Sequence, residues 1–342
     1  MMRFPHLSYK EKQTASAHEI GRRYTQEDVL KIGEIPVAGT ERPAYFVLDG
    51  HGGSDVSEIC GDTVIPFIME TSPFKEIRQD TPAREYIELL TQAIHEAFDK
   101  MQADVLGKSW QIARQGTCIT GCILTSHGFV IINLGDSVTC LYDKDGTIVF
   151  KTREHKPDDP VEKKRIEAEG GRVGYVSGIA RVNGNLAVSR AFGDADIQNI
   201  SHTPDIQWLT LEESARVARI MVCCDGYYER SDAITLCTRI GQSKDMPVAE
   251  VVEKATADSI KEGSCDNLTM ILLDVDASIE PATEPLVAAA AAAAAATTTE
   301  CAPIAESDGT TPTEPNAAAC QSVAAPSDEA EPKRLKSDSS SN

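Results

Sequence analysis

The chain has 342 residues, a formal net charge of -20 and a sequence pI near 4.8. This acidic balance argues against nucleic acids and anionic membranes as partners, because both would repel the protein. No apolar run approaches the roughly 20 residues of a membrane-spanning helix, and the N-terminus lacks the apolar core of a signal peptide, so we expect a soluble protein that is neither secreted nor imported into an organelle.

Apolar residues in short runs, or at spacings of three and four, predict strands and helices along the first 276 residues. In chain order they are a strand at 44–48, helices at 55–70 and 84–104, strands at 117–124, 129–134, 138–142 and 147–150, a helix at 159–169, strands at 186–189 and 220–224, helices at 231–240 and 248–261, and a strand at 268–275. Turn signals at Ser126-His127-Gly128, Asp145-Gly146 and Asn183-Gly184 indicate antiparallel hairpins. Layered sheets with helices outside are therefore favoured over a parallel, doubly wound sheet.

The composition changes abruptly after Asp276. An alanine run at 288–296 leads into Thr, Ser, Pro and acidic residues, with ten acidic and three basic residues from Ala277 onwards. Such a segment can build little core, so we expect one domain over 1–276 and a low-complexity, disordered tail over 277–342. Its basic cluster, Lys333-Arg334-Leu335-Lys336, is either a nuclear import signal or a solvated charge cluster. The ten cysteines form no Cys-x-x-Cys pair, which favours a reducing compartment, so we expect a cytoplasmic protein, with the nucleus as a second location.

Four short acidic clusters punctuate the chain: Glu27-Asp28, Asp49-Gly50, Asp225-Gly226 and Asp266-Asn267. The last three lie at one end of an apolar run, so strand ends can bring together carboxylates that are far apart in sequence. Converging buried carboxylates are disfavoured by desolvation and repulsion unless they are protonated or bind cations. Each Asp-Gly pair alone is an ordinary turn signal, but a turn explains neither the adjoining His51-Gly52-Gly53 nor the pair Glu27-Asp28. The pattern therefore predicts a metal site.

Oxygen ligands without an accompanying set of histidines or thiolates select Mg²⁺ or Mn²⁺ over zinc or copper. Asp49 is the best candidate for a bridging ligand, because one carboxylate can touch two ions about 3.5 to 4 Å apart. Gly50 would let the backbone approach them. Two such ions lower the pKa of a shared water and neutralise charge on an incoming phosphate. The residues thus predict a pair of Mn²⁺ or Mg²⁺ ions and the hydrolysis of a phosphoester.

At this level of detail the chain resembles the type 2C protein phosphatases, a family of metal-dependent serine/threonine phosphatases. The resemblance covers eight blocks in family order, which lie at 21–28, 47–53, 116–117, 133–137, 154–157, 181–194, 224–226 and 264–267. They include Asp49-Gly50-His51-Gly52-Gly53 and Glu154-His155-Lys156-Pro157. The resemblance implies an α+β fold, a four-layer α/β/β/α sandwich in which two packed antiparallel sheets are flanked by helices, with a dimetal cleft at one end.

The resemblance also implies a ligand set for the two ions. Glu27, Asp49 and the carbonyl of Gly50 would surround one ion, and Asp49, Asp225 and Asp266 would surround the other, so that Asp49 bridges them.

Four further residues match family positions, each with a simpler alternative. Asp136 would bind a third, weaker ion, or would only order the turn between two strands. Asp28 would orient bound water or ligands, or would cap nearby backbone amides. Arg23 matches the phosphate-binding arginine, with an ordinary exposed arginine as the alternative; on an extended strand Arg22 would face the other way. His51 matches the general acid that protonates the departing serine or threonine oxygen, or would merely hydrogen-bond a neighbouring carboxylate.

Some positions depart from the family pattern or have an open role. Gln26 and Tyr228 stand where methionine and tryptophan are common, and Glu229 replaces an aspartate, which puts the metal preference in doubt. His155 and Lys156 are expected to stabilise a loop, with contact to substrate as the alternative.

The resemblance implies a protein serine/threonine phosphatase that acts on phosphorylated proteins, as a monomer, by direct attack of a water activated by the two ions. One alternative is a catalytically weak pseudophosphatase that binds phosphoproteins; it would predict loss of Asp49, Asp225 or Asp266, and all three are present. The other is a hydrolase of small phosphoesters or nucleotides, which turnover on phosphopeptides and nucleotides would distinguish.

Overall fold

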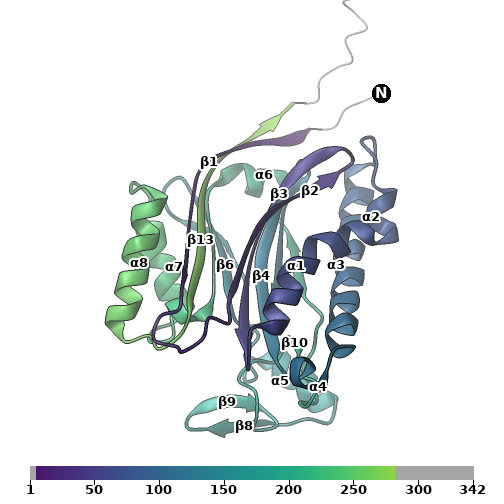
Figure 1. Ribbon diagram of the computed structural model, residues 1–342. Helices are drawn as coiled ribbons and strands as arrows, with labels where there is room; N and C mark the ends of the chain where they lie inside the picture. The colour runs from purple at the N-terminus through teal and green to yellow at the C-terminus, as the bar shows by residue number, and fades with distance from the viewer. Residues whose placement is uncertain (1–4, 282–342) are drawn as a thin grey trace, which may run out of the picture. The chain divides into compact units, whose positions relative to one another are not determined.

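The computed structural model describes residues 5–281, and their strands form two large antiparallel sheets packed face to face with helices outside (Figure 1). The first sheet has the order β1 (His6–Glu19), β13 (Leu268–Glu280), β12 (Val217–Cys223), β6 (Val138–Asp143) and β7 (Ile148–Lys151). The second has the order β11 (Asp205–Trp208), β5 (Gly128–Leu134), β4 (Gly116–Thr125), β3 (Thr40–His51) and β2 (Val29–Val37), with β10 (Phe192–Gly193) paired to β4. A separate hairpin joins β8 (Val173–Val176) to β9 (Ile179–Val182).

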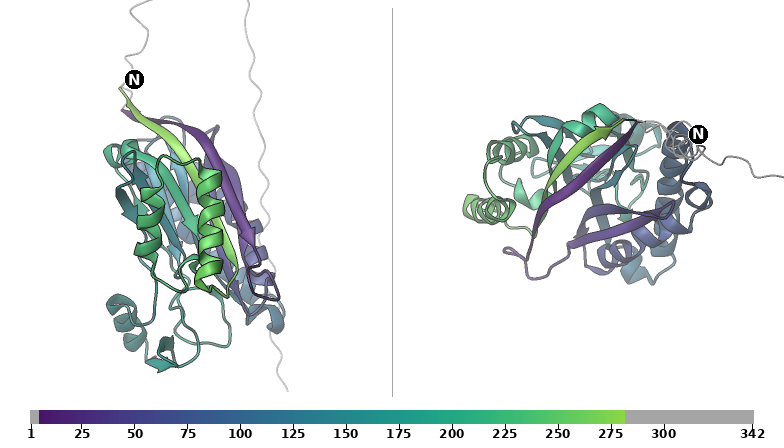
Figure 2. Two further views of the ribbon diagram at one scale, coloured as in Figure 1. Left: turned by 90° about the vertical axis from the view of Figure 1, so that its left-hand side faces the viewer. Right: turned by 90° about the horizontal axis from the view of Figure 1, so that it is seen from above.

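Helices cover the outer face of each sheet (Figures 1 and 2). The second sheet is covered by α1 (Asp55–Glu70) and α3 (Ala83–Leu106), and the first by α7 (Ala233–Gln242) and α8 (Val248–Glu262). The shorter helices are α2 (Ser72–Glu76), α4 (Trp110–Ala113), α5 (Pro160–Ala168) and α6 (Leu211–Arg216). None of the described helices is long and apolar enough to cross a membrane. The predicted four-layer α+β architecture is confirmed.

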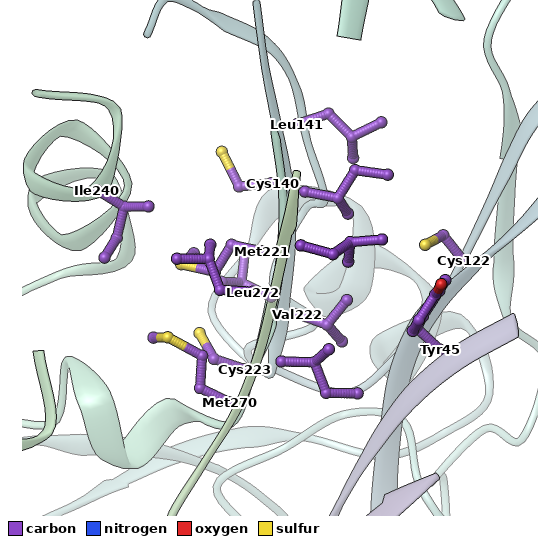
Figure 3. Packing of buried hydrophobic residues seen from close by; sticks show 14 of the residues in the cluster. Tyr45, Cys122, Cys140, Leu141, Met221, Val222, Cys223, Ile240, Met270 and Leu272 are labelled. Carbon is purple, nitrogen blue, oxygen red and sulfur yellow. The ribbon is translucent and has the colours of Figure 1, made fainter. Parts of the chain in front are cut away.

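Because successive side chains of a strand point to opposite faces, one strand supplies two layers of core. In β3, Tyr45 and Val47 pack between the two sheets, whereas Phe46 and Leu48 pack under the helices. The first sheet follows the same rule: Leu141 and Val222 point toward the second sheet, and Cys140 and Met221 point toward α7 (Figure 3). Strands buried on both faces read as continuous apolar runs, which is why the sequence predicts these strands well.

Two long strands at sheet edges were not predicted. Among the strands of residues 5–281, β1 pairs only with β13, and β2 pairs only with β3. The sequence of β1 is largely polar, and most of its residues are exposed or half-buried. It therefore lacks the apolar run by which buried strands are recognised.

The predicted strand at 186–189 is wrong. Leu186 makes only an isolated bridge with Val182, across the turn at Asn183-Gly184. The next residues leave the ladder, since the amide of Ser189 donates to the carbonyl of His155. Val188 packs with Cys118 and Ala191 in a small separate cluster, so burial there does not require a strand.

The last strand runs past the expected domain boundary. β13 continues from Asp276 to Glu280 and pairs there with the start of β1, for example Ala277 with Tyr9 and Glu280 with His6. The rest of the predicted tail, with its basic cluster at 333–336, lies outside the described residues.

Candidate active site

Chain segments from both sheets meet at one end of the sandwich and bring several carboxylates together. Asp49 lies near the end of β3, Asp225 follows β12 and opens the short 3-10 turn η1 (Asp225–Tyr227), and Asp136 lies in the turn between β5 and β6. Carboxylate oxygens of these three residues all lie within 4.8 Å of one another. A second cluster of the same kind joins Asp28, Asp49 and the thiol of Cys224. Asp49 is therefore common to both clusters.

Burial and mutual repulsion make these carboxylates hard to ionise. Burial, followed by the charges of neighbouring aspartates, raises the pKa of Asp49 well above its ordinary value and that of Asp225 to about 8. Burial is also the largest cause that raises the pKa of Asp28 to about 6. The Oδ2 atom of Asp28 is buried and has no hydrogen-bond partner among residues 5–281. An oxygen-rich site with an unpaired buried oxygen fits a hard divalent cation, which would favour the ionised carboxylates.

Glu27 and Asp266 belong to neither cluster among the described residues. Glu27 instead brings its backbone against Gly50, where an added Cβ would lie 2.2 Å from the Glu27 carbonyl oxygen. Ser57, on α1, donates to the same carbonyl at 2.5 Å. Asp266 is held by Arg23, whose Nη2 donates to its Oδ2 at 2.8 Å.

Arg23 lies in a turn and not on the extended strand that the sequence suggested. Its side chain is 51% exposed, beside Asp266. Arg22 does point away from the site, but for a different reason than strand alternation: its Nη2 donates to the carbonyl of Ile260 at the end of α8. A half-exposed guanidinium next to the acidic clusters is available for an incoming anion.

Asn267 fixes the loop that carries Arg23 and Glu27. Its side-chain oxygen accepts from the amide of Glu27 at 2.9 Å, and its Nδ2 donates to the carbonyls of Ile20 and Thr25 at 2.9 and 3.0 Å. No role was predicted for this buried asparagine. Its position directly after Asp266 was the available signal.

Lys156 points into the acidic site. Its ammonium contacts Oδ2 of Asp136 and lies 4.0 Å from Oδ2 of Asp225. Burial alone would raise the pKa of Asp136, but the charge of Lys156 holds it below the ordinary value. An ion at Asp136 would therefore have to displace Lys156. Its neighbour His155 is buried and accepts from the amide of Gly135 at 3.0 Å, as expected of a residue that stabilises a loop.

His51 is paired with a carboxylate from a distant part of the chain. Its Nε2 lies 3.0 and 2.9 Å from the two oxygens of Asp194. Burial would lower the pKa of His51, but the hydrogen bond and charge of Asp194 raise it. No role was predicted for Asp194, although it ends the block at 181–194.

Glu229 does not join either carboxylate cluster. Its Oε2 accepts from the amide of Cys265 at 2.7 Å and from the hydroxyl of Ser264 at 3.2 Å. The longer side chain that replaces aspartate therefore secures the loop before Asp266.

Comparisons with known proteins identify relatives of this chain and of its fold. A family model described as Protein phosphatase 2C matches residues 17–268. The chain is 30% identical to protein phosphatase 1B of Homo sapiens over 272 residues, which cover 74% of this chain and 55% of the human protein. It is 29% identical to protein phosphatase ppm-1.A of Caenorhabditis elegans over 255 residues, covering 69% of this chain and 53% of that protein. The chain thus spans about half the length of these curated relatives.

Among solved structures, the chain is similar to a serine-threonine phosphatase 2C from Toxoplasma gondii. The TM-score is 0.66 at 24% sequence identity, and the match covers 80% of this chain and 98% of that one. This likeness shows the fold.

Proposed function

The chain belongs to the protein phosphatase 2C family, and from this membership we propose that it is a metal-dependent protein serine/threonine phosphatase. The observation that carries the proposal is the position of Asp49, whose carboxylate is shared by two clusters that draw on both sheets, one with Asp136 and Asp225 and the other with Asp28 and the thiol of Cys224. Phosphorylated proteins are the proposed substrates, and the cytoplasm is the proposed location, with the nucleus as a second one.

The proposed metal ligands are Asp49 as the bridge, Asp225 and Asp266 on one side, and Glu27 with the carbonyl of Gly50 on the other. Mn²⁺ and Mg²⁺ suit this donor set, because it consists of oxygen atoms. When bound, such ions act as Lewis acids that lower the pKa of water and neutralise charge on a phosphoryl group. Asp136 stays the proposed ligand of a third, weaker ion, which would compete with Lys156 for the same carboxylate.

The protein's own residues supply the rest of the proposed reaction. Arg23 would exchange its contact with Asp266 for the oxygens of the phosphoryl group, to which a planar guanidinium can make paired hydrogen bonds. His51 would donate a proton to the serine or threonine oxygen as it leaves. Both side chains are part-exposed at the same end of the sandwich.

The test is phosphate release from a phosphothreonine peptide by wild type and by Asp49→Ala, with Mn²⁺ or Mg²⁺ or with EDTA. We expect metal-dependent release that falls at least about 1,000-fold in Asp49→Ala, since the shared ligand of both clusters is lost. Asp145→Ala is the matched control, because Asp145 begins an exposed Asp-Gly turn between β6 and β7 and belongs to neither carboxylate cluster.

Two results would contradict the proposal. No release from folded, metal-supplied wild type would favour a protein that binds phosphoproteins without hydrolysing them. Faster turnover of nucleotides than of phosphopeptides would favour a small-molecule hydrolase.

A further inference from the structure

We propose that Asp194 is a positioning residue for His51: its carboxylate accepts a hydrogen bond from Nε2 and keeps the proton there, so that the second proton of the imidazolium, on Nδ1, is the one donated to the leaving oxygen. This inference rests on the proposed phosphatase activity for its kinetic consequence, but not for its structural one.

The contact between the two side chains defines the direction of the hydrogen bond. Both oxygens of Asp194 lie within 3.0 Å of Nε2, and an ionised carboxylate can only accept. Nε2 must therefore donate. Nδ1 of His51 has no hydrogen-bond partner among residues 5–281, and it is not one of the buried polar atoms that lack a partner. It is therefore the ring nitrogen that another molecule can reach.

The backbone around Asp194 is held from two sides. Its amide donates to the carbonyl of Gln115 at 2.9 Å. The amide of the preceding residue, Gly193, donates to Oε1 of Gln102 on α3, also at 2.9 Å. Asp194 also adopts a φ of 49°, a left-handed conformation that is uncommon for residues other than glycine. Such conformations persist where surrounding contacts hold them, and they are concentrated at functional sites.

Gly116 gives the pair its space. It lies opposite His51 in the β3–β4 register and opposite Gly193 in the β10–β4 register. A Cβ on Gly116 would lie 2.3 Å from both Nε2 of His51 and Oδ2 of Asp194. Three strands therefore converge on one hydrogen bond, and the side chain of Asp194 is only 3% exposed.

A simpler reading is that the pair only ties the loop after β10 to the end of β3. The two readings differ in how they treat leaving groups. A positioned acid matters for a poor leaving group such as threonine, and hardly at all for p-nitrophenolate, which departs without a proton. A purely structural contact would affect both substrates alike.

The kinetic test compares Asp194→Asn and His51→Gln on a phosphothreonine peptide and on p-nitrophenyl phosphate. We expect each variant to lose about 100-fold in kcat on the peptide, in the usual range for general acid catalysis, and less than about fivefold on p-nitrophenyl phosphate. The double variant should be no slower than the slower single variant, because the two residues act as one unit. Asp196→Asn, at an exposed aspartate two residues away, is the matched control and should match wild type. Equal slowing on both substrates, or additive losses in the double variant, would overturn the proposal.

A second measurement does not depend on activity. At a pH high enough to leave the histidine rings neutral, two-bond nitrogen–proton NMR correlations, with His51 assigned by its absence in His51→Gln, should show its remaining proton on Nε2 in wild type. Asp194→Asn and Gly116→Ala should each change that pattern. A neutral ring protonated on Nδ1 and not on Nε2 in folded wild type would overturn the proposal even if the protein proved to have no phosphatase activity, and the expected pattern in an inactive protein would leave the pairing intact while refuting the proposed function.

Discussion

At the scale of single residues, the acidic site lowers the free energy of unfolding of the metal-free protein. Asp225 lies close to Asp49 and Asp136 and is also repelled by Asp266 and Asp28, while Lys156 offsets part of their charge. Its pKa of about 8 lies above the ordinary value of 3.8, so the folded state holds a proton that the unfolded state releases. Stability of the metal-free protein should therefore fall as the pH rises from about 4 to 8. Destabilised groups of this kind are typical of functional sites.

We predict that Asp225→Asn makes the metal-free protein more stable. At pH 8 in EDTA its melting temperature should rise by at least about 3 °C, the shift that 1 kcal/mol produces in a domain of this size, because the amide removes a repelled charge. The advantage should shrink toward pH 4, where wild-type Asp225 is protonated in the folded state.

Adding Mn²⁺ gives the complementary result. Wild type should gain melting temperature with the ion and the variant should gain little, since a ligand has been lost. If Asp225→Asn melted below wild type at pH 8 without metal, the repulsion described here would not be the dominant effect.

At the scale of elements, one buried glutamate holds a helix and a loop together. Glu162, on α5, is fully buried. Arg190 donates to both of its oxygens, at 3.0 and 2.5 Å, and the hydroxyl of Ser189 donates at 2.9 Å. Arg190 also bonds Asp205, at the start of β11. The segment that ends in Asp194 is thus fixed to α5 and to the second sheet by a single ionic network.

We predict that Glu162→Gln destabilises the protein by about 3 kcal/mol at pH 7, because it removes the buried one of the two carboxylates that neutralise Arg190. Burial would raise the pKa of Glu162, but Arg190 and Ser189 lower it to about 2. Its contribution is therefore complete above about pH 4.5 and is lost as the pH falls toward 2, so the difference between variant and wild type in urea unfolding should shrink over that range.

Glu167→Gln is the control for this network. Glu167 lies on the same helix and is exposed, and its one ion pair within the described part of the chain is with Lys163, at 4.0 Å. Its substitution should change stability by less than about 0.5 kcal/mol. A similar loss in both variants would mean that helix charge, and not the buried network, explains the effect.

At the scale of the whole molecule, the sequence predicts strands that carry their own apolar signal, but it does not predict contacts between residues that lie far apart in the chain. Apolar runs predict β4, β5, β6 and β12, because both faces of these strands are buried. The polar edge strand β1 has no such signal.

The same division holds in the site. The acidic clusters at strand ends predict that Asp49 and Asp225 lie close together, as they do. The contacts of Asn267 with Glu27 and of Asp194 with His51 join residues 240 and 143 positions apart. No spacing rule relates residues so far apart, so only the fold reveals the partners of Asn267 and Asp194.

We predict that the position of a C-terminal truncation decides its effect. A chain ending at residue 281 should keep the melting temperature and turnover of the full chain. A chain ending at 276 should lose about 1 to 3 kcal/mol of stability, because it removes the β13 residues that pair with His6–Tyr9 and uncovers the buried Leu7. Equal melting temperatures for the two truncations would show that this end of the β1–β13 ladder contributes nothing.

The proposed ligands of the metal centre come from both sheets: Asp49 from β3 in the second, and Asp225 and Asp266 beside β12 and β13 in the first. Bound ions would therefore fasten one sheet to the other at that end. Without them the carboxylates would lie together only while they hold protons, so this end of the molecule would open more readily as the pH rises. Proteolysis acts on such opened states. For a protein built in this way, the supply of divalent cations would determine its lifetime against proteolysis as well as its rate of turnover.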